Sequence, residues 1–288
     1  MNKTIKIVEC PRDAMQGLHK FIPTDKKIAY LTQLLKVGFH TLDCGSFVSP
    51  KAIPQMRDTK EVIAALDLSN TKTKLLTIVV NERGANDACK FDKITYLGYP
   101  FSISETFQLR NTNATIEESL ERVQTIQDIC LKNGKILVVY ISMGFGNPYG
   151  DDWNLEIVQK WVNHLQMMGI KILSLSDTIG VATQESIEYL FSKLIPMYPD
   201  IEFGAHLHTR MDNWKPRIKS SLLNGCLRFD GAINGHGGCP MAKDDLTGNM
   251  PTENMAFYFE SKGYETGINK EAFFDAMQMA QRIFPEKQ

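Results

Sequence analysis

The sequence predicts an α/β fold, a single closed (β/α)8 TIM barrel with one additional helix at its C-terminus. Short β-branched apolar runs alternate with longer amphipathic stretches along all 288 residues, which is typical of βα units around a parallel sheet. Eight such runs can be counted. No linker rich in Ser, Gly or Pro interrupts the alternation, so we expect residues 1–288 to form one domain. An open doubly wound sheet is the alternative.

The eight expected strands are short apolar runs separated by helical patterns. They lie at residues 6–10, 41–44, 75–80, 93–97, 136–140, 172–175, 203–208 and 229–233. The clearest helix begins at Thr115, because Thr115 and Glu118 form a Thr-x-x-Glu capping box, and it ends at Asn133 and Gly134, which tolerate a left-handed cap. A last helix is expected around residues 271–283.

Charge and composition exclude several classes of partner. The chain has 32 Lys and Arg against 33 Asp and Glu, so no basic field attracts nucleic acid or an anionic membrane. The N-terminal residues have no apolar signal segment, and no stretch approaches the roughly 20 apolar residues of a membrane span. Six dispersed cysteines without a C-x-x-C pair indicate reduced thiols. We expect a cytoplasmic protein that binds neither nucleic acid nor membrane.

A histidine pair in the seventh strand is the first candidate for a functional site. His206 and His208 are two residues apart, so both imidazoles point to the same face of the strand and can hold one metal ion. Such a pair alone is more often a core or surface pair than a metal site. Further ligands are therefore needed.

A carboxylate at the end of the first strand can supply such a ligand. Arg12 and Asp13 follow this strand, where a barrel displays its catalytic groups, although an isolated Arg-Asp pair is usually a solvated turn. In a closed barrel the eighth strand lies between the seventh and the first. We therefore expect Asp13, His206 and His208 to meet around one ion at the barrel mouth.

A glycine-rich loop follows the eighth strand and carries a cysteine. Gly235, Gly237 and Gly238 precede Cys239, so this thiol is not expected to fill the core as most cysteines do. The loop could also cradle a phosphate, but it matches neither G-x-G-x-x-G nor the Walker pattern. We expect Cys239 to act at the barrel mouth.

Seven motifs occur in order along most of the chain. They are Pro11-Arg12-Asp13 with Gln16, Ser46-Phe47-Val48-Ser49-Pro50-Lys51, Pro54-Gln55-Met56, Ser176-Asp177-Thr178-Ile179-Gly180, His206-Leu207-His208, Gly237-Gly238-Cys239-Pro240 and Gly248-Asn249. Together they resemble the 3-hydroxy-3-methylglutaryl-CoA lyase family, within the metal-dependent barrel group that includes the isopropylmalate and homocitrate synthases.

The resemblance implies a set of site residues. It implies a divalent ion, Mg²⁺ or Mn²⁺, bound by Asp13, His206, His208 and Asn249. It also implies residues with catalytic or substrate-binding roles. The catalytic residues would be Arg12, Asp43, Asp177, His206 and Cys239, and the substrate would contact Arg12, Gln16 and Ser46.

The resemblance also implies a reaction. A base would remove the proton of a tertiary alcohol, and the adjacent carbon–carbon bond would break to give acetoacetate and the enolate of acetyl-CoA. Arg12 would stabilise the enolate and Cys239 would protonate it. Asp43 and Asp177 can equally be read as residues that cap the ends of their strands.

The sequence departs from the family pattern around the expected barrel mouth. Asp43 stands where the family usually has glutamate, and Thr209-Arg210 stands where Asp-Thr is usual. Residues 243–246 are more polar than usual, and Asn147 replaces a common cysteine. These changes bear on the substrate more than on the fold, and they leave room for a related hydroxyacyl-CoA.

Three functions fit these residues. The first is lyase activity on 3-hydroxy-3-methylglutaryl-CoA or a close relative. The second is a Claisen-type acyl transferase of the isopropylmalate or homocitrate synthase kind, and the third is a barrel that binds metal or acyl-CoA without turnover. The expected partners are an acyl-CoA substrate and, from the resemblance, a second copy of the chain in a homodimer.

Overall fold

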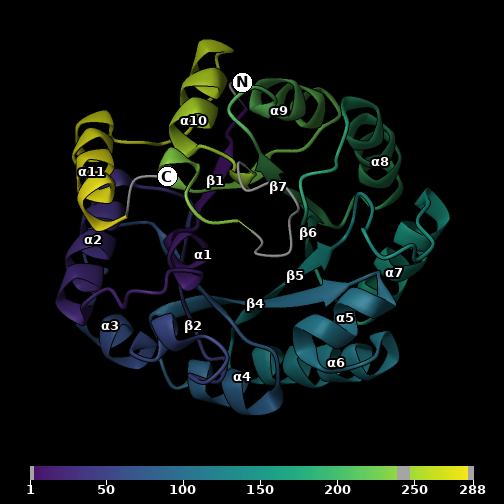
Figure 1. Cartoon of the computed structure of the whole chain (residues 1–288), viewed down its shortest axis with the longest axis horizontal. Helices are drawn as coiled ribbons and strands as arrows, with labels where there is room; N and C mark the ends of the chain where they lie inside the picture. Colours follow the sequence, from purple (N-terminus) through teal and green to yellow (C-terminus); the bar gives the residue numbers. More distant parts are fainter. Residues whose placement is uncertain (1–2, 239–246, 285–288) are drawn as a thin grey trace.

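The protein forms a closed barrel of eight parallel strands, as the sequence predicts (Figure 1). The computed structural model describes residues 3–238 and 247–284. Neighbours in sequence pair around the ring, and the pairs β8 with β1 and β6 with β7 close it. The strands are β1 Lys6–Glu9, β2 Thr41–Ser46, β3 Lys74–Ile78, β4 Ile94–Ser102, β5 Ile136–Ser142, β6 Ile172–Asp177, β7 Glu202–Thr209 and β8 Arg228–Gly231.

Helices surround this ring on the outside (Figure 1). The expected capping box is present, with Thr115 as the N-cap and Glu118 closing it. The expected last helix is α11. The helices are α1 Pro11–Gln16, α2 Thr24–Val37, η1 Pro54–Met56, α3 Thr59–Ala65, α4 Glu82–Cys89, α5 Glu105–Thr112, α6 Ile116–Lys132, α7 Leu155–Met167, α8 Gln184–Met197, α9 Trp214–Leu223, η2 Ile233–Gly235, α10 Thr252–Ser261 and α11 Lys270–Ile283.

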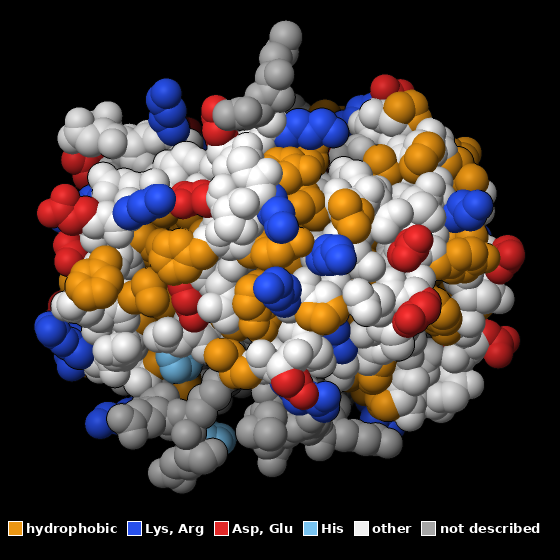
Figure 2. All heavy atoms as spheres, turned by 90° about the horizontal axis from the view of Figure 1, so that it is seen from above, with side chains coloured by type: hydrophobic (Ala, Val, Ile, Leu, Met, Phe, Trp, Pro, Cys, Tyr) orange, Lys and Arg blue, Asp and Glu red, His pale blue; other side chains and the backbone are white. Residues whose placement is uncertain are grey.

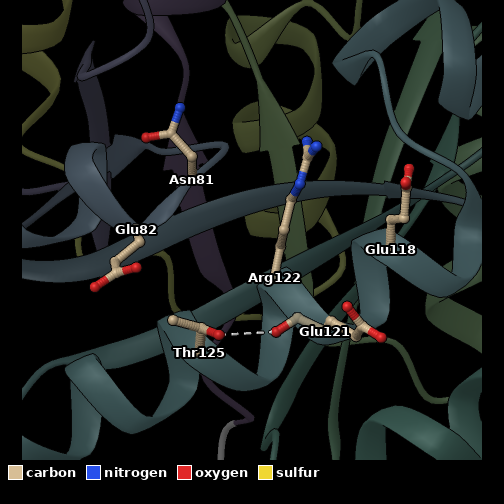
Figure 3. Close-up of a pocket in the computed structure, with 6 residues that line it drawn as sticks. All are labelled: Asn81, Glu82, Glu118, Glu121, Arg122 and Thr125. Atoms are coloured by element: carbon tan, nitrogen blue, oxygen red, sulfur yellow. Dashed lines mark hydrogen bonds between the residues drawn. The ribbon is translucent and has the colours of Figure 1, made fainter.

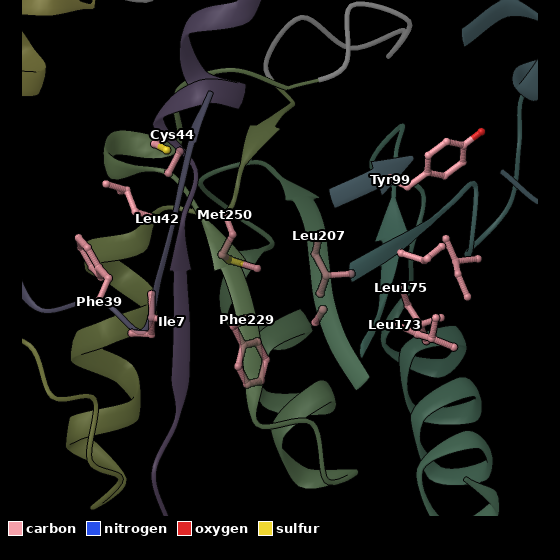
Figure 4. Packing of buried hydrophobic residues seen from close by; sticks show 14 of the residues in the cluster. Ile7, Phe39, Leu42, Cys44, Tyr99, Leu173, Leu175, Leu207, Phe229 and Met250 are labelled. Carbon is pink, nitrogen blue, oxygen red and sulfur yellow. The ribbon is translucent and has the colours of Figure 1, made fainter. Parts of the chain in front are cut away.

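The hydrophobic core has two parts. The larger part fills the space between the barrel and its helices, where Ile7, Leu42, Phe229 and other buried side chains pack (Figure 4). The smaller part is a separate cluster. It consists of Leu76, Ile78, Tyr96, Val138, Tyr140 and Ile172, on strands β3 to β6. These packed layers fix the strand ends that carry the functional side chains.

Two elements near the mouth were not expected from the sequence. The turn after β1 is a short helix, α1, which begins at Pro11 because proline suits the first helical turn. A two-residue strand, β9 Gly248–Asn249, pairs antiparallel with β7 and sets Asn249 opposite His208. Two residues are too few to show strand periodicity in a sequence.

Charged side chains of both signs are interspersed with hydrophobic ones on the side face of the molecule drawn in Figure 2. The two signs of charge are thus mixed on this face.

None of the helices in the described residues has the length and hydropathy of a membrane span.

Candidate active site

Three side chains from β7 and α1 converge at the barrel mouth. Asp13, His206 and His208 each offer a ligand atom, and these atoms lie within 4.8 Å of one another. The strand order explains the meeting, because β8 pairs with both β7 and β1 and so places these two strands on its two sides. The structure thus brings together the three side chains that the sequence predicts to share one ion.

Both histidines are held through Nδ1. The Nδ1 atom of His206 lies 3.1 Å from Oδ2 of Asp230, and that of His208 lies 2.9 Å from the carbonyl oxygen of Thr178. An Nδ1–H group that donates to these oxygens leaves Nε2 as the ligand atom, which is the usual arrangement of metal-binding histidines. The Nε2 atom of His208 is buried and has no hydrogen-bond partner in the described part of the chain. An orphaned acceptor beside a carboxylate fits a bound cation.

Asp13 is buried and surrounded by donors. Its Oδ1 accepts hydrogen bonds from Arg12 Nη1 at 3.0 Å and Gln16 Nε2 at 2.8 Å, and its Oδ2 accepts one from Asn249 Nδ2 at 2.6 Å. Burial raises the pKa of Asp13, but Arg12, the two histidines and Asn249 outweigh it and lower the pKa to about 2. Asp13 is therefore ionised at neutral pH and available as a metal ligand.

Arg12 connects this cluster to Asp43. Asp43 accepts hydrogen bonds from Arg12 Nε at 3.0 Å and Nη2 at 2.5 Å, while Arg12 Nη1 donates to Asp13 and Gln16. Burial raises the pKa of Asp43 to about 6 against the lowering effect of Arg12. Two carboxylates share one guanidinium, so the group holds an excess negative charge that favours a cation.

The glycine loop packs directly against Asp13. A Cβ atom at Gly237 would lie 2.7 Å from the Asp13 carbonyl oxygen and 2.9 Å from Asn249 Nδ2, and the φ angle of Gly237 is +81°. Only glycine adopts this φ angle readily and has no Cβ atom to collide with these neighbours. The glycines thus let the loop approach the metal cluster, whereas Cys239 lies outside the described residues.

Asp177 and Ser46 are buried and hold the backbone near the site. The Asp177 carboxylate accepts hydrogen bonds from Arg217 Nη1 at 2.8 Å and from the backbone N–H groups of Val181 and Ala182. Ser46 Oγ accepts a hydrogen bond from Val48 N at 3.2 Å. The contacts of Asp177 match the interpretation that it caps the end of its strand, whereas Ser46, expected to contact the substrate, bonds to the loop backbone.

A pocket of about 450 Å³ opens above the cluster. Arg12, Asp13, Gln16, His206 and His208 line it, whereas Asp43, Asp177, Ser46 and Asn249 are not among its lining residues. The remaining lining is mostly apolar. It comprises Gly17, Val48, Ala52, Ile53, Ile78, Val80, Pro100, Phe107, Arg110, Asn111, Tyr140, Ser142, Ser176, Thr178 and Gly238.

A second hollow, of about 370 Å³, lies outside the barrel along α4 and α6 (Figure 3). The residues that line it are Asn81, Glu82, Glu118, Glu121, Arg122 and Thr125. Glu118 is already used in the capping box of α6. None of these six side chains is an imidazole or a thiol.

The groups that orient the two histidines were not predicted from the sequence. Asp230 holds His206, the Thr178 carbonyl holds His208, and Arg217 donates to Asp177 and to the His208 carbonyl. The sequence contains a feature that could have pointed to Asp230, because it is a charged residue inside the eighth apolar run. No such feature points to the Thr178 carbonyl, because every residue has a backbone carbonyl.

The sequence matches a known family over nearly its whole length. A family model described as HMGL-like covers residues 4–280. A hydroxymethylglutaryl-CoA lyase of Bacillus subtilis is 32% identical over 281 residues, which are 95% of this chain and 90% of the relative. A 3-hydroxy-3-isohexenylglutaryl-CoA/hydroxymethylglutaryl-CoA lyase of Pseudomonas aeruginosa is 32% identical over 277 residues, 96% of this chain and 91% of the relative.

Solved structures agree with this match. A Bacillus subtilis HMG-CoA lyase superposes with a TM-score of 0.91 at 29% identity and covers 98% of this chain and 94% of its own. An Acinetobacter baumannii HMG-CoA lyase, solved with coenzyme A and 3-methylmalate, gives a TM-score of 0.88 at 29% identity, covering 97% and 91%. With its barrel, its convergent Asp13, His206 and His208, and these relatives, the chain is an enzyme of the HMGL-like family of lyases.

Proposed function

We propose that the protein cleaves 3-hydroxy-3-methylglutaryl-CoA to acetyl-CoA and acetoacetate. One observation carries the proposal. Arg12 and the ligand atoms of Asp13, His206 and His208 gather on one side of a pocket at the mouth of the barrel. The relatives named as HMG-CoA lyases support the same substrate.

A divalent ion, Mg²⁺ or Mn²⁺, is the proposed cofactor. Asp13, His206 Nε2 and His208 Nε2 would hold it, with Asn249 as a fourth ligand, and open positions suit such ions. Bound there, it would supply a positive charge that holds the oxygens of the substrate. The orphaned Nε2 of His208 and the ionised Asp13 support this assignment.

Arg12 is proposed to stabilise the enolate of acetyl-CoA. Its guanidinium is fixed by Asp43, Asp13 and Gln16, so its positive charge is in place before negative charge develops on the thioester oxygen. Asp43 is not among the lining residues of the pocket, and it acts by positioning Arg12. Asp177 likewise acts through the loop that contains Thr178.

Two proton transfers complete the proposed reaction. The proton of the tertiary alcohol leaves as the carbon–carbon bond breaks. His206 is the proposed catalytic residue, since it lines the pocket and Asp230 supports its ring. It acts either as a ligand of the ion through Nε2 or, where Nε2 is not bound to the ion, as the base that accepts this proton at Nε2. The enolate then takes a proton from Cys239, whose thiol is protonated at neutral pH if its pKa is near the ordinary ~8.5. If His206→Ala abolishes turnover with metal affinity intact, His206 acts as a base. Loss of metal affinity identifies it as a ligand.

The proposed activity is tested with purified, reduced protein loaded with Mg²⁺ or Mn²⁺. The expected product of incubation with 3-hydroxy-3-methylglutaryl-CoA is acetoacetate, measured with equimolar acetyl-CoA. A Cys239→Ala variant should lose most of this turnover and still bind the metal. Absence of both products from the metal-loaded protein overturns the proposal.

Three further expectations are part of this proposal. The chain acts as one domain, it forms a homodimer, and it resides in the cytoplasm. Sedimentation of the purified protein tests the dimer, and a single cooperative unfolding transition tests the single domain.

A further inference from the structure

A second group of metal-ligating side chains shares His206 with the cluster at the barrel mouth. Cys10, His206 and Asp230 each offer a ligand atom, and these atoms lie within 4.8 Å of one another. Asp230 pairs with His206 on one side and with Val8 on the other. Cys10 lies two residues after Val8, and its N–H donates to the Gly231 carbonyl at 2.8 Å, so its side chain is on the same face as that of Val8. We call Cys10, His206 and Asp230 the inner cluster.

The carboxylate of the inner cluster is only half satisfied. Its Oδ2 atom lies 3.1 Å from His206 Nδ1, whereas Asp230 Oδ1 is buried and has no hydrogen-bond partner among the described residues. The buried Cys10 thiol makes only a long contact of 3.7 Å with the Val8 carbonyl oxygen. A buried carboxylate oxygen without a partner costs free energy, so it indicates a ligand that the protein atoms do not supply.

The surroundings of the inner cluster favour a positive ion. Burial raises the pKa of the Cys10 thiol, and the carboxylates Asp230, Asp43 and Asp13 raise it further against the effect of Arg12. These carboxylates therefore place a negative potential at the sulfur atom. A cation bound between the thiol and Asp230 would be stabilised by this potential.

A buried water molecule is the alternative occupant. The Nε and Nη2 atoms of Arg228 also lack hydrogen-bond partners in the described part of the chain, and water can bridge such atoms to Asp230 Oδ1. Arg228 Nη1, however, donates to Glu202 at 3.2 Å, so the charge of Arg228 is already paired. Neutral water leaves the excess negative charge of the inner cluster unbalanced, whereas a cation removes it.

The donor set of the inner cluster selects a different kind of ion from that at the mouth. Sulfur, imidazole nitrogen and one carboxylate oxygen are typical ligands of Zn²⁺, whereas Mg²⁺ prefers oxygen. Ligand atoms around zinc lie about 3.5 Å apart, because the bonds are roughly 2.0 to 2.3 Å long. Side-chain movements of about 1 Å would therefore close the inner cluster around an ion.

We propose that Cys10, Asp230 and His206 Nδ1 bind a thiophilic divalent ion such as Zn²⁺ or Cd²⁺, and that this ion and the cofactor ion exclude each other. The ion replaces the thiol proton, which is released to solvent. It also replaces the Nδ1 proton of His206, which returns to the ring at Nε2. An Nε2–H group cannot bind a metal, so the two ions compete through one imidazole. The exclusion rests on the proposed cofactor site, whereas binding at the inner cluster does not.

Cd²⁺ titration followed by ultraviolet absorption tests the inner site, because a Cd²⁺–thiolate bond gives a charge-transfer band that nitrogen and oxygen ligands do not give. The starting protein carries Cys239→Ala, so that Cys239 contributes no thiolate. We expect one equivalent of Cd²⁺ to produce the band and an added Cys10→Ser to abolish it. Cys130→Ser is the matched control, at a buried cysteine that belongs to no metal-ligand group among the described residues. Absence of the band from the starting protein, or a band that survives Cys10→Ser, overturns the inference.

Two measurements show that the Cys10→Ser result is not a loss of folding. Cys10→Ser should bind Mn²⁺ with the affinity of the starting protein, because serine keeps the size of cysteine. X-ray absorption of the original protein with one equivalent of Zn²⁺ needs no substitution at Cys10 and should show one sulfur neighbour at about 2.3 Å. A shell of nitrogen and oxygen alone overturns the inference.

Addition of Mn²⁺ to the Cd²⁺-loaded protein tests the exclusion. Mn²⁺ should bleach the thiolate band and raise the apparent Kd of Cd²⁺ by roughly 10- to 100-fold, a usual size for coupling between two sites. In His208→Ala, which lacks a ligand at the mouth, the band should resist Mn²⁺, and in His164→Ala it should not. A band that resists Mn²⁺ in a protein that binds both ions overturns the exclusion. If the band forms but Mn²⁺ does not bind, only the proposed cofactor site fails, and if Mn²⁺ binds without a band, only the inner site fails.

Discussion

The pocket at the barrel mouth has a polar wall of Arg12, Asp13, Gln16, His206 and His208, and an apolar wall that includes Val48, Ile53, Ile78 and Phe107. The two walls are built by different kinds of interaction. On the polar wall each side chain is fixed by a hydrogen bond to a specific partner, as His206 is by Asp230 and His208 by the Thr178 carbonyl. On the apolar wall, side chains such as Ile78 are held by packing. Hydrogen-bonded positions lose function when one atom changes, whereas packed positions tolerate substitutions of similar volume. The first wall therefore carries the residues of the proposed chemistry, and the second bounds the space beside them.

Removal of one metal ligand should have the largest effect. His208→Ala deletes the orphaned Nε2, so we expect metal affinity to be lost and kcat/KM to fall on the order of 10³-fold, since a metal ion contributes several kcal/mol of charge stabilisation. His164→Ala, at an exposed histidine on α7, is the matched control. Calorimetry with Mn²⁺ and steady-state kinetics check both. An unchanged affinity would remove His208 from the ligand set.

Arg12→Gln should have the next largest effect. We expect kcat to fall by roughly 10² to 10³, because a fixed charge on the developing enolate is lost. The free energy of unfolding should also fall by about 3 to 5 kcal/mol, because Asp43 stays buried without its partner. The control is Arg83→Gln on the exposed face of α4.

A double variant separates these two consequences. Arg12→Gln combined with Asp43→Asn removes both charges and should recover much of the stability but none of the activity. Recovery of activity would show that Arg12 acts only as a structural partner of Asp43.

Asp230→Asn should lower the metal affinity by an intermediate amount. The asparagine keeps the shape but loses the charge that orients the His206 ring, so we expect metal affinity to fall by about 10 to 100-fold. Asp212→Asn, at an exposed aspartate, is the control. Equal Mn²⁺ affinities in the three proteins would mean that Asp230 does not support a ligand.

Glu9, at the end of β1, makes the stability of the protein depend on pH. It is buried and accepts hydrogen bonds from Thr252 Oγ1 and Ile233 N, and burial raises its pKa to about 8 against these hydrogen bonds. In the unfolded chain the carboxyl group titrates near 4.5. Between these values the folded protein binds a proton that the unfolded chain has released, so the contribution of Glu9 to the free energy of unfolding falls as the pH rises from about 5 to 8.

The Glu9→Gln variant tests this dependence. Denaturant unfolding across this pH range should show a shallower decline in Glu9→Gln than in the original protein. Identical slopes in the two proteins would show that Glu9 does not titrate in this window.

A substitution in the apolar wall should have the smallest effect. Ile78→Val removes one methylene, so we expect the free energy of unfolding to fall by about 0.5 to 1.5 kcal/mol and metal affinity to stay the same. Denaturation and Mn²⁺ calorimetry measure the two quantities. A loss of metal affinity as large as that of Asp230→Asn would show that the two walls are not independent.

Much of the barrel and of its metal cluster could be predicted from the sequence. The alternation of runs predicts the strand order, and the order alone predicts that Asp13, His206 and His208 meet. Asn249 could be anticipated only through the resemblance, because the two-residue strand that sets it opposite His208 has no periodic pattern.

The roles of Asp43 and Asp177 could not be predicted in the same way. Asp177 ends β6, whereas Asp43 lies inside β2 and not at the end of its strand as the sequence suggested. Their positions in the sequence do not show which way the carboxylates face. In the structure one is bound to Arg12 and the other to Arg217 and two backbone N–H groups. Such orientations depend on tertiary contacts, which a single sequence does not encode locally.

The most direct test of the account is a crystal structure of the protein grown with Mn²⁺, with the ion located by its anomalous scattering. We expect one strong peak at the barrel mouth, bound by Asp13 and by the Nε2 atoms of His206 and His208. A peak elsewhere, or a mouth without an ion at saturating Mn²⁺, would contradict it.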